Sequence, residues 1–147
     1  MKTAIIYYSR HHGNTKQLLD AIAAQYPVTL IDAVENPHAD LEEYDCIGLA
    51  SGIYYSKFHK SVTALAEEKL PNMKKVFFLY TCGAKKDSYT AAVTRLADLK
   101  GCDILGEYGA LGYDTYGPFK LIGGIAKGHP DQSELEGAVR FYESIAK

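Results

Sequence analysis

Short apolar runs alternate with segments of helical period along the whole chain, and this alternation limits the possible folds more than any other feature. The runs are nearly continuous, which is typical of parallel strands covered by helices on both faces. The predicted strands are Lys2–Tyr8, Val28–Asp32, Asp45–Ala50, Lys75–Tyr80 and Asp103–Leu111. Five strands are too few for a closed eight-stranded barrel. We therefore expect an α/β fold with an open, doubly wound parallel sheet and right-handed crossovers.

The segments between these runs carry apolar residues on one helical face. The faces comprise Leu18, Leu19, Ile22 and Ala23; Val62, Leu65, Ala66 and Leu70; Tyr89, Val93, Leu96 and Leu99; and Leu135, Ala138, Val139, Tyr142 and Ile145. Pro130 and a Ser133-x-x-Glu136 capping box are expected near the start of the last helix. The connection Ala33–Tyr44 is short and broken by a proline, so it is predicted to hold at most a short helix near Ala39–Glu43.

The composition predicts one domain over all 147 residues. A net charge of −2 favours neither a nucleic-acid binder nor an acidic tail. No apolar run reaches the roughly 20 residues of a membrane helix, and the N-terminal residues lead straight into a strand, unlike a signal peptide. The cysteines Cys46, Cys82 and Cys102 are odd in number and include no Cys-x-x-Cys pair. We therefore expect a cytoplasmic protein without a disulfide framework.

The segment Ser9–Thr15 links the first predicted strand to the first predicted helix. The first turn of a helix leaves N–H groups unpaired and its dipole favours an anion, and Gly13 lets the backbone approach a ligand closely. The surrounding donors and cationic or titratable side chains are Ser9, Arg10, His11, His12, Asn14, Thr15 and Lys16. This combination suits a phosphate monoester. The alternative is an ordinary strand–turn–helix with Asn14 or Thr15 as the N-cap.

The complete residue spacing of other known ligand-binding and catalytic motifs is not found in this sequence. Gly123 and Gly128 have the glycine spacing of a P-loop, but neither the following Lys-Ser/Thr nor a preceding strand is present. The dinucleotide fingerprint Gly-x-Gly-x-x-Gly is absent, and no Gly-x-Ser-x-Gly elbow follows a strand. His38 and His59 have no metal-ligand spacing around them. The loop after the first strand therefore remains the strongest candidate site.

Three stretches carry a resemblance to a known family. The stretch from Ile5 to Lys16 resembles the phosphate loop of the flavodoxin family, whose common form is Ser/Thr-x-Thr-Gly-Asn-Thr. Here His11-His12 stands where one Thr is usual, so the loop is one residue longer. Ile47–Tyr55 resembles the family's second flavin loop, and Thr81–Gly83 lies where its third begins. The resemblance covers essentially the whole chain and implies a three-layer α/β/α fold whose five parallel strands have the order 2-1-3-4-5.

The resemblance also implies that the chain binds FMN. The implied cofactor-binding residues are Ser9, Arg10, His11, His12, Gly13, Asn14, Thr15, Ser51, Gly52, Ile53, Tyr54, Tyr55, Thr81, Cys82 and Gly83. An aromatic side chain suits stacking on the flavin ring, and Tyr55 is favoured over Tyr54. The alternative is that both tyrosines pack on the following helix. Backbone N–H groups of the loop that starts at Thr81 would face the flavin carbonyls, whereas Cys82 is expected to be a small core residue without a redox role.

Two later loops are also rich in glycine. Gly112–Phe119 is expected to close over the same edge of the sheet. Lys120–His129 is expected to be either a flap or a plain surface loop. No catalytic side chain and no metal ligand is assigned.

The leading hypothesis is an FMN-binding electron-transfer protein that serves a redox partner protein, with the chemistry supplied by the flavin. Flavodoxins as a family tend to be strongly acidic, whereas this chain is nearly neutral and has basic or titratable residues near the presumed flavin edge: Lys57, His59, Lys60, Lys85 and Lys86. The alternative is an FMN-dependent quinone reductase or oxidoreductase that uses a small quinone-like acceptor. Ser51–Lys60 also resembles the equivalent segment of menaquinone-dependent protoporphyrinogen oxidase, although that family's long basic insertion before the last helix is not found here. A third hypothesis is a flavodoxin-fold domain without flavin, against which the run Gly13-Asn14-Thr15 argues.

Overall fold

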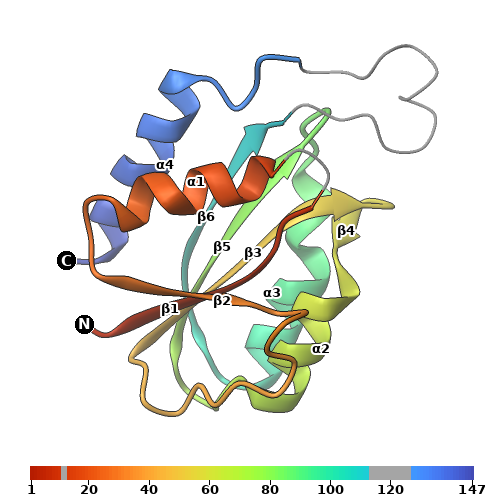
Figure 1. Ribbon diagram of the computed structural model, residues 1–147. Coiled ribbons are helices and arrows are strands. Elements are labelled where there is room, and N and C mark those ends of the chain that lie inside the picture. The colour runs from red at the N-terminus through yellow and green to blue at the C-terminus, as the bar shows by residue number, and fades with distance from the viewer. Residues whose placement is uncertain (11–12, 113–126) are drawn as a thin grey trace.

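Five parallel strands form the central sheet of the computed structural model, which describes residues 1–10, 13–112 and 127–147 (Figure 1). The strands are β1 (Thr3–Tyr8), β2 (Val28–Asp32), β3 (Cys46–Tyr54), β5 (Lys75–Cys82) and β6 (Asp103–Leu111). They lie in the order β2–β1–β3–β5–β6, and the two-residue β4 (Lys57–Phe58) pairs antiparallel with the end of β3. Without β4, the parallel strands follow the predicted order 2-1-3-4-5, which confirms the α/β fold class.

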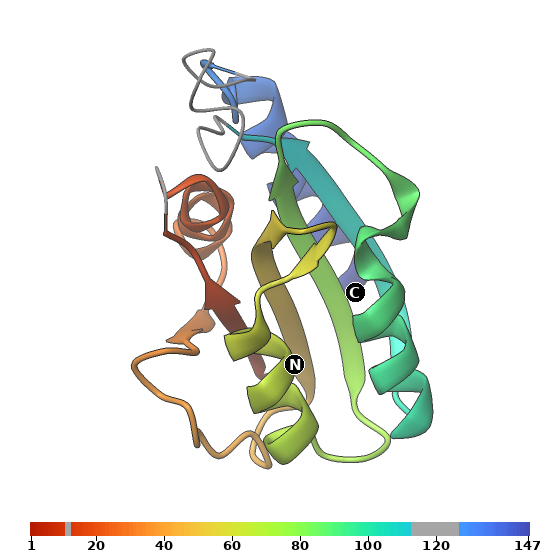
Figure 2. The same ribbon diagram turned by 90° about the vertical axis from the view of Figure 1, so that its right-hand side faces the viewer.

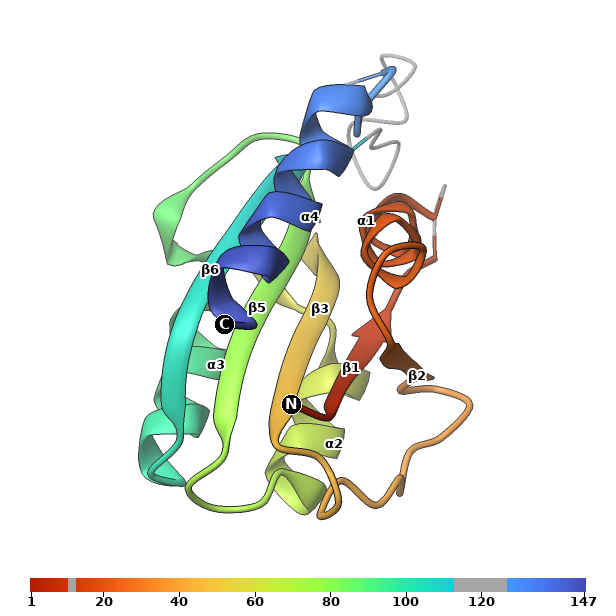
Figure 3. The same cartoon turned by 90° about the vertical axis from the view of Figure 1, so that its left-hand side faces the viewer.

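Helices cover both faces of the sheet, as the continuous apolar runs predicted (Figures 2 and 3). One face carries α1 (Asn14–Ala23) and α4 (Gln132–Ile145), and the other carries α2 (Lys60–Lys69), the short 3-10 helix η1 (Asp87–Thr90) and α3 (Ala91–Leu99). Successive strand residues point to opposite faces. Phe77 therefore packs with α1 and α4, whereas its neighbour Phe78 packs with α2 and α3. Within the described ranges, every helix is too short or too polar to cross a bilayer.

The structure corrects the prediction for the start of the last helix. Asp131, not Ser133, is the N-cap of α4; its side chain accepts a hydrogen bond from the Glu134 N–H, and the Glu134 side chain accepts one from the Asp131 N–H. The predicted box lies two residues too late because α4 already begins at Gln132. Ser133 is therefore inside the first turn, where its hydroxyl donates to Asp131 Oδ1 instead.

The connection between β2 and β3 contains turns and no helix over Ala39–Glu43. Its start is fixed by Asp32, whose Oδ1 accepts the N–H of Val34 at 2.9 Å. Such side-chain to backbone bonds compete with helix formation in short connections.

The carboxyl ends of β1, β3, β5 and β6 meet at one edge of the sheet (Figure 1). The strand order reverses between β1 and β3, and open α/β sheets bind ligands beyond such a reversal. Two contacts close this edge. The Gly112 N–H donates to the Cys82 carbonyl at 2.9 Å, and a Cβ on Gly112 would lie 2.7 Å from Asn14 Nδ2. The loops predicted from sequence to bind a ligand are therefore neighbours.

Candidate functional site

The start of α1 has the geometry of an anion-binding site. Its N-cap is Gly13, in the left-handed conformation with φ of 67°, and no side chain caps the helix. Asn14 and Thr15, the expected N-caps of the alternative interpretation, are instead the first helical residues. Among the described residues, a Cβ added to Gly13 would meet no atom within 4 Å, so these residues leave the helix start open. Helix N-termini of this kind bind phosphate through their unpaired N–H groups.

Backbone groups remain available at this helix start. The Ser9 hydroxyl accepts the Lys16 N–H at 2.9 Å, and the Gln17 N–H donates to the Gly13 carbonyl at 3.1 Å. Within the described part of the chain, the N–H groups of Gly13 and Thr15 form no hydrogen bond. Ser9 therefore shapes the loop from inside, and the open donors belong to the backbone.

The cationic side chains of this loop pair with carboxylates. Arg10 lies 3.1 Å from Asp32 and over the Tyr8 ring, 5.2 Å from its centroid. Burial opposes ionisation of Asp32, but hydrogen bonds from Arg10 and from backbone N–H groups outweigh it, so the pKa of Asp32 is lowered. Lys16 pairs with Asp20 at 2.6 Å. Much of the positive charge expected to surround a phosphate is thus compensated, while His11 and His12 lie outside the described residues.

A buried pair of hydroxyls joins the first loop to the third. Thr15 Oγ1 and Thr81 Oγ1 are 2.8 Å apart, and the two residues are only 1% and 4% exposed. The Thr15 hydroxyl, expected to donate to a ligand, is therefore engaged with the end of β5. This contact between residues far apart in sequence has no local signal, and the sequence interpretation did not find it.

The second predicted loop begins as part of β3. The prediction that this strand ends at Ala50 is wrong, because Ser51–Tyr54 continue it and Ile53 and Tyr54 then pair with β4. Ser51 is fully buried, and its hydroxyl accepts the His59 N–H at 3.0 Å and donates to the Gly52 carbonyl at 2.5 Å. These bonds hold the segment as the base of the β3–β4 hairpin.

The hairpin tip is conformationally unusual. Tyr55 and Ser56 both have positive φ, 51° and 66°, which is the geometry of a two-residue type I′ turn that normally takes Asn or Gly. Bulky residues rarely adopt this conformation, and such strain concentrates at functional sites. The Tyr55 residue is 81% exposed at this tip.

Tyr54 joins an aromatic cluster that the sequence interpretation missed. The Tyr8 and His59 rings are stacked, with centroids 3.6 Å apart and planes 6° apart. The Tyr54 ring meets both edge-on, at 5.6 Å from Tyr8 and 5.4 Å from His59. Tyr54 thus packs against the start of α2, as the alternative interpretation of the two tyrosines proposed, whereas Tyr55 extends outward at the tip.

His59 has a defined role at the start of α2. It is the N-cap, and its Nδ1 accepts the Ser61 N–H at 3.1 Å. Since Nδ1 is an acceptor, the ring N–H of the neutral form lies on Nε2. Burial lowers the pKa of His59, and the charges of Lys60 and Arg10 lower it further. The imidazole is therefore neutral at pH 7. An N-cap preference for His is too weak a signal to find this residue from sequence.

A hollow of about 460 Å³ lies beside the hairpin. Its described lining comprises Tyr8, Tyr54, Tyr55, Lys57, Phe58, His59 and Lys60. Only Tyr54 and Tyr55 of this set were among the predicted site residues.

The third predicted loop leaves the end of β5. Thr81 and Cys82 are the last residues of the strand, and the partly buried Gly83 follows. The Cys82 thiol is buried and lies 3.7 Å from the Ala110 carbonyl oxygen, which agrees with its interpretation as a core residue. The Tyr89 hydroxyl donates to the Ala84 carbonyl at 2.6 Å and holds the loop onto η1.

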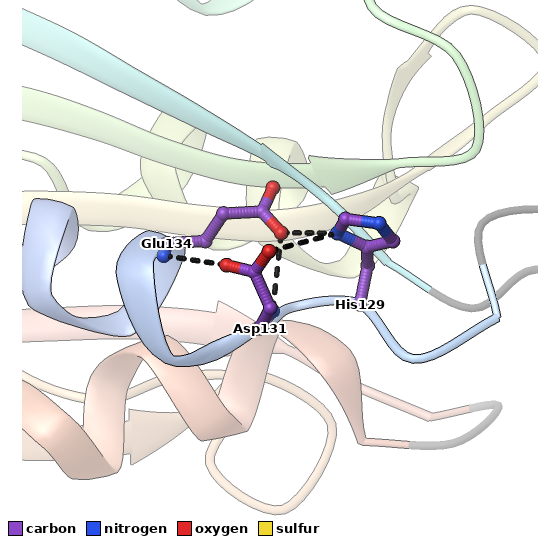
Figure 4. Close-up of side chains that lie close together, drawn as sticks. All are labelled: His129, Asp131 and Glu134. Atoms are coloured by element: carbon purple, nitrogen blue, oxygen red, sulfur yellow. Dashed lines mark hydrogen bonds and ion pairs between the residues drawn. The ribbon is translucent and has the colours of Figure 1, made fainter.

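A separate cluster lies at the start of α4 (Figure 4). The ligand-type atoms of His129, Asp131 and Glu134 lie within 4.8 Å of one another. Glu134 Oε2 accepts the Leu111 N–H at 2.8 Å, its Oε1 accepts the Asp131 N–H at 3.1 Å, and Oε1 also bonds His129 Nδ1. These bonds engage both carboxylate oxygens of Glu134. The cluster fastens α4 to the end of β6, and we assign it a structural role.

Comparison with known proteins agrees with this geometry. A sequence model of the flavodoxin domain matches residues 5–133. An uncharacterized protein of Methanocaldococcus jannaschii is 36% identical across 100% of this chain and 99% of its own length. Oxidised flavodoxin 1 of Bacillus cereus superposes with a TM-score of 0.70 at 18% identity, covering 99% of this chain and 97% of that one. For rubredoxin oxygen:oxidoreductase of Desulfovibrio gigas the TM-score is 0.72 at 14% identity, covering 99% and 35%. The two structural matches show the fold, and the domain match shows the family. The chain therefore belongs to the flavodoxin domain family.

Proposed function

We propose that the chain binds FMN at the carboxyl edge of its sheet and acts as an electron-transfer protein. The observation that carries this proposal is the open start of α1, where Gly13 has no side chain to occupy the space before the helix. A phosphate monoester fits there because the first turn supplies N–H donors and contains no acidic residue. When bound, FMN supplies the one- and two-electron redox chemistry.

The remaining predicted contacts follow from the arrangement of the loops. In this proposal the backbone of Gly13–Thr15 holds the phosphate, and Ser51–Tyr55 and Thr81–Gly83 border the ring. The Thr15–Thr81 hydroxyl pair supports a shared site, since it fixes the first loop against the third. Tyr55 remains our proposed aromatic partner of the ring, whereas Tyr54 packs against Tyr8 and His59. Arg10 faces Asp32, so we expect it to contribute less than the backbone.

Two matched glycine variants test the cradle. Gly13 and Gly101 both have φ of 67°, so Gly→Ala strains the backbone alike at each. At Gly13 the new Cβ faces the proposed phosphate, whereas at Gly101 it would lie 3.7 Å from Met73. We expect Gly13→Ala to weaken FMN binding roughly tenfold, through loss of charge-assisted hydrogen bonds, and to change riboflavin binding little. Gly101→Ala should change neither.

The measurement is quenching of flavin fluorescence during titration of the folded protein with FMN and with riboflavin. Equal losses of the two affinities in Gly13→Ala would show that the loop holds no phosphate. If the wild-type protein does not bind FMN at micromolar concentration, this result would favour the flavin-free hypothesis over both flavin-dependent hypotheses.

An FMN-dependent oxidoreductase with a small quinone-like acceptor is the second candidate. The hollow beside the hairpin favours it, because a pure electron carrier needs no pocket of about 460 Å³ next to its cofactor. The electron-carrier proposal instead requires a redox partner protein. Steady-state turnover of a quinone with a nicotinamide donor, without any partner protein, would reject the pure carrier. The three cysteines, all within the described residues, are buried and form no disulfide, which supports our proposal of a reducing, cytoplasmic location.

A further inference from the structure

The hollow beside the hairpin extends beyond the three loops proposed to hold FMN. It is bordered by the end of β1, by the β3–β4 hairpin and by the start of α2. Its described lining includes no residue of Ser9–Thr15 or of Thr81–Gly83. Only Tyr54 and Tyr55 at the hairpin belong to both regions. Its volume of about 460 Å³ lies within the roughly 300–1,000 Å³ range of small-molecule sites.

The walls of the hollow are aromatic and flat. The Tyr8 and His59 rings lie face to face with centroids 3.6 Å apart, so each covers one face of the other, and the Tyr54 ring stands edge-on to both. Phe58 is 3% exposed and supplies an apolar wall, while Tyr55 is held outward by its strained turn. Aromatic rings associate by offset stacking and edge-to-face contact. These aromatic walls therefore suit a planar aromatic ligand, which can contact them through ring edges as well as ring faces.

The charged groups in the described lining of the hollow are all cationic. Lys57 and Lys60 are exposed, and among the described residues neither has a carboxylate within ion-pair distance. Arg10, near Tyr8, is already paired with Asp32. The positive charge available to a ligand therefore comes from the two lysines, which favour an anion.

His59 adds a neutral hydrogen-bond donor. Its Nδ1 is occupied by the Ser61 N–H at 3.1 Å, so its remaining ring nitrogen carries the proton. A carboxylate accepts hydrogen bonds and has none to give. A lining with two ammonium groups and an imidazole N–H therefore matches a carboxylate better than an amine or a cation.

We propose that this hollow binds a planar aromatic carboxylate beside the flavin site and separate from it. If this carboxylate is the substrate of a flavin-dependent oxidoreductase, the proposal rests on the proposed function. As a statement about binding, it rests on the hollow alone. The two can therefore be tested independently.

The test uses 2-naphthoate and its uncharged analogue 2-naphthalenemethanol, each titrated into the full-length protein without flavin and followed by calorimetry and protein NMR. We expect 2-naphthoate to bind more tightly and to shift resonances of Tyr8, Tyr54 and His59. The double variant Lys57→Gln/Lys60→Gln should weaken 2-naphthoate binding roughly tenfold, since two exposed ion pairs are lost. The same variant should leave 2-naphthalenemethanol binding unchanged.

Lys85→Gln/Lys86→Gln is the matched control. These lysines are also exposed but do not line the hollow. Equal losses of 2-naphthoate affinity in the two double variants would show nonspecific attraction and overturn the proposal. Absence of 2-naphthoate binding, or shifts confined to other residues, would overturn it as well.

Competition with FMN separates the two proposals. With FMN at saturation, we expect the affinity for 2-naphthoate to change less than about threefold, because the two sites share only Tyr54 and Tyr55 of the hairpin. Competitive displacement by FMN would identify the hollow as the flavin's own site and overturn the inference. If FMN does not bind while 2-naphthoate does, the proposed function fails and the ligand class of the hollow is supported.

Discussion

At the scale of single residues, the Thr15–Thr81 pair shows how a buried polar contact can join two loops of the proposed site. Both hydroxyls are almost fully buried, and each is the other's partner at 2.8 Å. A satisfied buried hydrogen bond adds only modestly to stability, whereas a buried hydroxyl that loses its partner costs its full desolvation penalty. The pair therefore favours one relative position of α1 and β5 over others.

A double-mutant cycle tests this pair. Thr15→Val and Thr81→Val should each lower the free energy of unfolding by about 1–3 kcal/mol, because each leaves one hydroxyl unsatisfied. The double variant should cost less than the sum of the single variants, with a coupling of about 1 kcal/mol. Urea unfolding followed by circular dichroism measures all four proteins. Thr29→Val, at an exposed position of β2, is the control and should change stability little.

Strict additivity of the two single effects would contradict the contact. An additive result would also remove the argument that the first and third loops are fixed to each other.

The same residues show which parts of the site could be predicted from sequence. Gly13 could be predicted because a glycine directly before a helix lets the backbone approach a ligand closely at the helix N-terminus, and this property depends on the local sequence alone. The Thr15–Thr81 contact and the Tyr8–His59 stack could not, because they join residues that only the strand order brings together. Ser51 was predicted to contact the cofactor, yet its hydroxyl is occupied by the backbone of Gly52 and His59.

At the scale of elements, the attachment of α4 to β6 depends on a titratable side chain. His129 bonds Glu134, whose other oxygen holds the Leu111 N–H at 2.8 Å. The bond to Glu134 raises the pKa of His129; partial burial opposes the rise, and the charges of Glu134 and Asp131 reinforce it. A raised pKa in the folded state means that protonation of His129 stabilises the fold.

The stability should therefore depend on pH in a defined direction. The contribution of His129 is complete below its unfolded pKa of about 6.5 and is lost as the pH rises through its higher folded pKa. Thermal unfolding between about pH 6 and pH 9 should show a falling melting temperature. His129→Gln and Glu134→Gln should each flatten this slope, since the first removes the proton site and the second removes the charge that stabilises it.

A slope that persists unchanged in both variants would assign the pH dependence to other groups. Glu134→Gln retains an oxygen that can accept the Leu111 N–H, so its effect reports on charge more than on the loss of that bond.

Most helices and strands could be predicted because the spacing of apolar residues along the chain reflects which side chains are buried. The runs Val28–Asp32 and Asp103–Leu111 match β2 and β6 residue for residue. The β3–β4 hairpin could not be predicted, since its turn residues Tyr55 and Ser56 lack the Asn-Gly signal of a type I′ turn. The capping box was misplaced because Asp131 and Ser133 both fit the local pattern.

At the scale of the whole molecule, the strand order assembles the proposed site. Because β1 lies between β2 and β3, and β5 follows β3, the loops after β1, β3 and β5 are adjacent in space though distant in sequence. The buried clusters on the two faces hold these strands in place. A ligand that contacts all three loops therefore binds only the folded chain, and binding must stabilise the fold.

FMN at about 100 times its Kd should accordingly raise the free energy of unfolding by about 2.7 kcal/mol. Riboflavin at the same concentration should raise it less, because it lacks the phosphate that the start of α1 is proposed to hold. Urea unfolding with each ligand measures the increments in wild type, Gly13→Ala and Gly101→Ala. The two variants should lose similar stability without ligand, since both place a Cβ at φ of 67°, but only Gly13→Ala should lose about half of the FMN increment, as a tenfold weaker affinity requires. An FMN increment that is undiminished in Gly13→Ala would place the phosphate elsewhere, even if the protein binds flavin tightly.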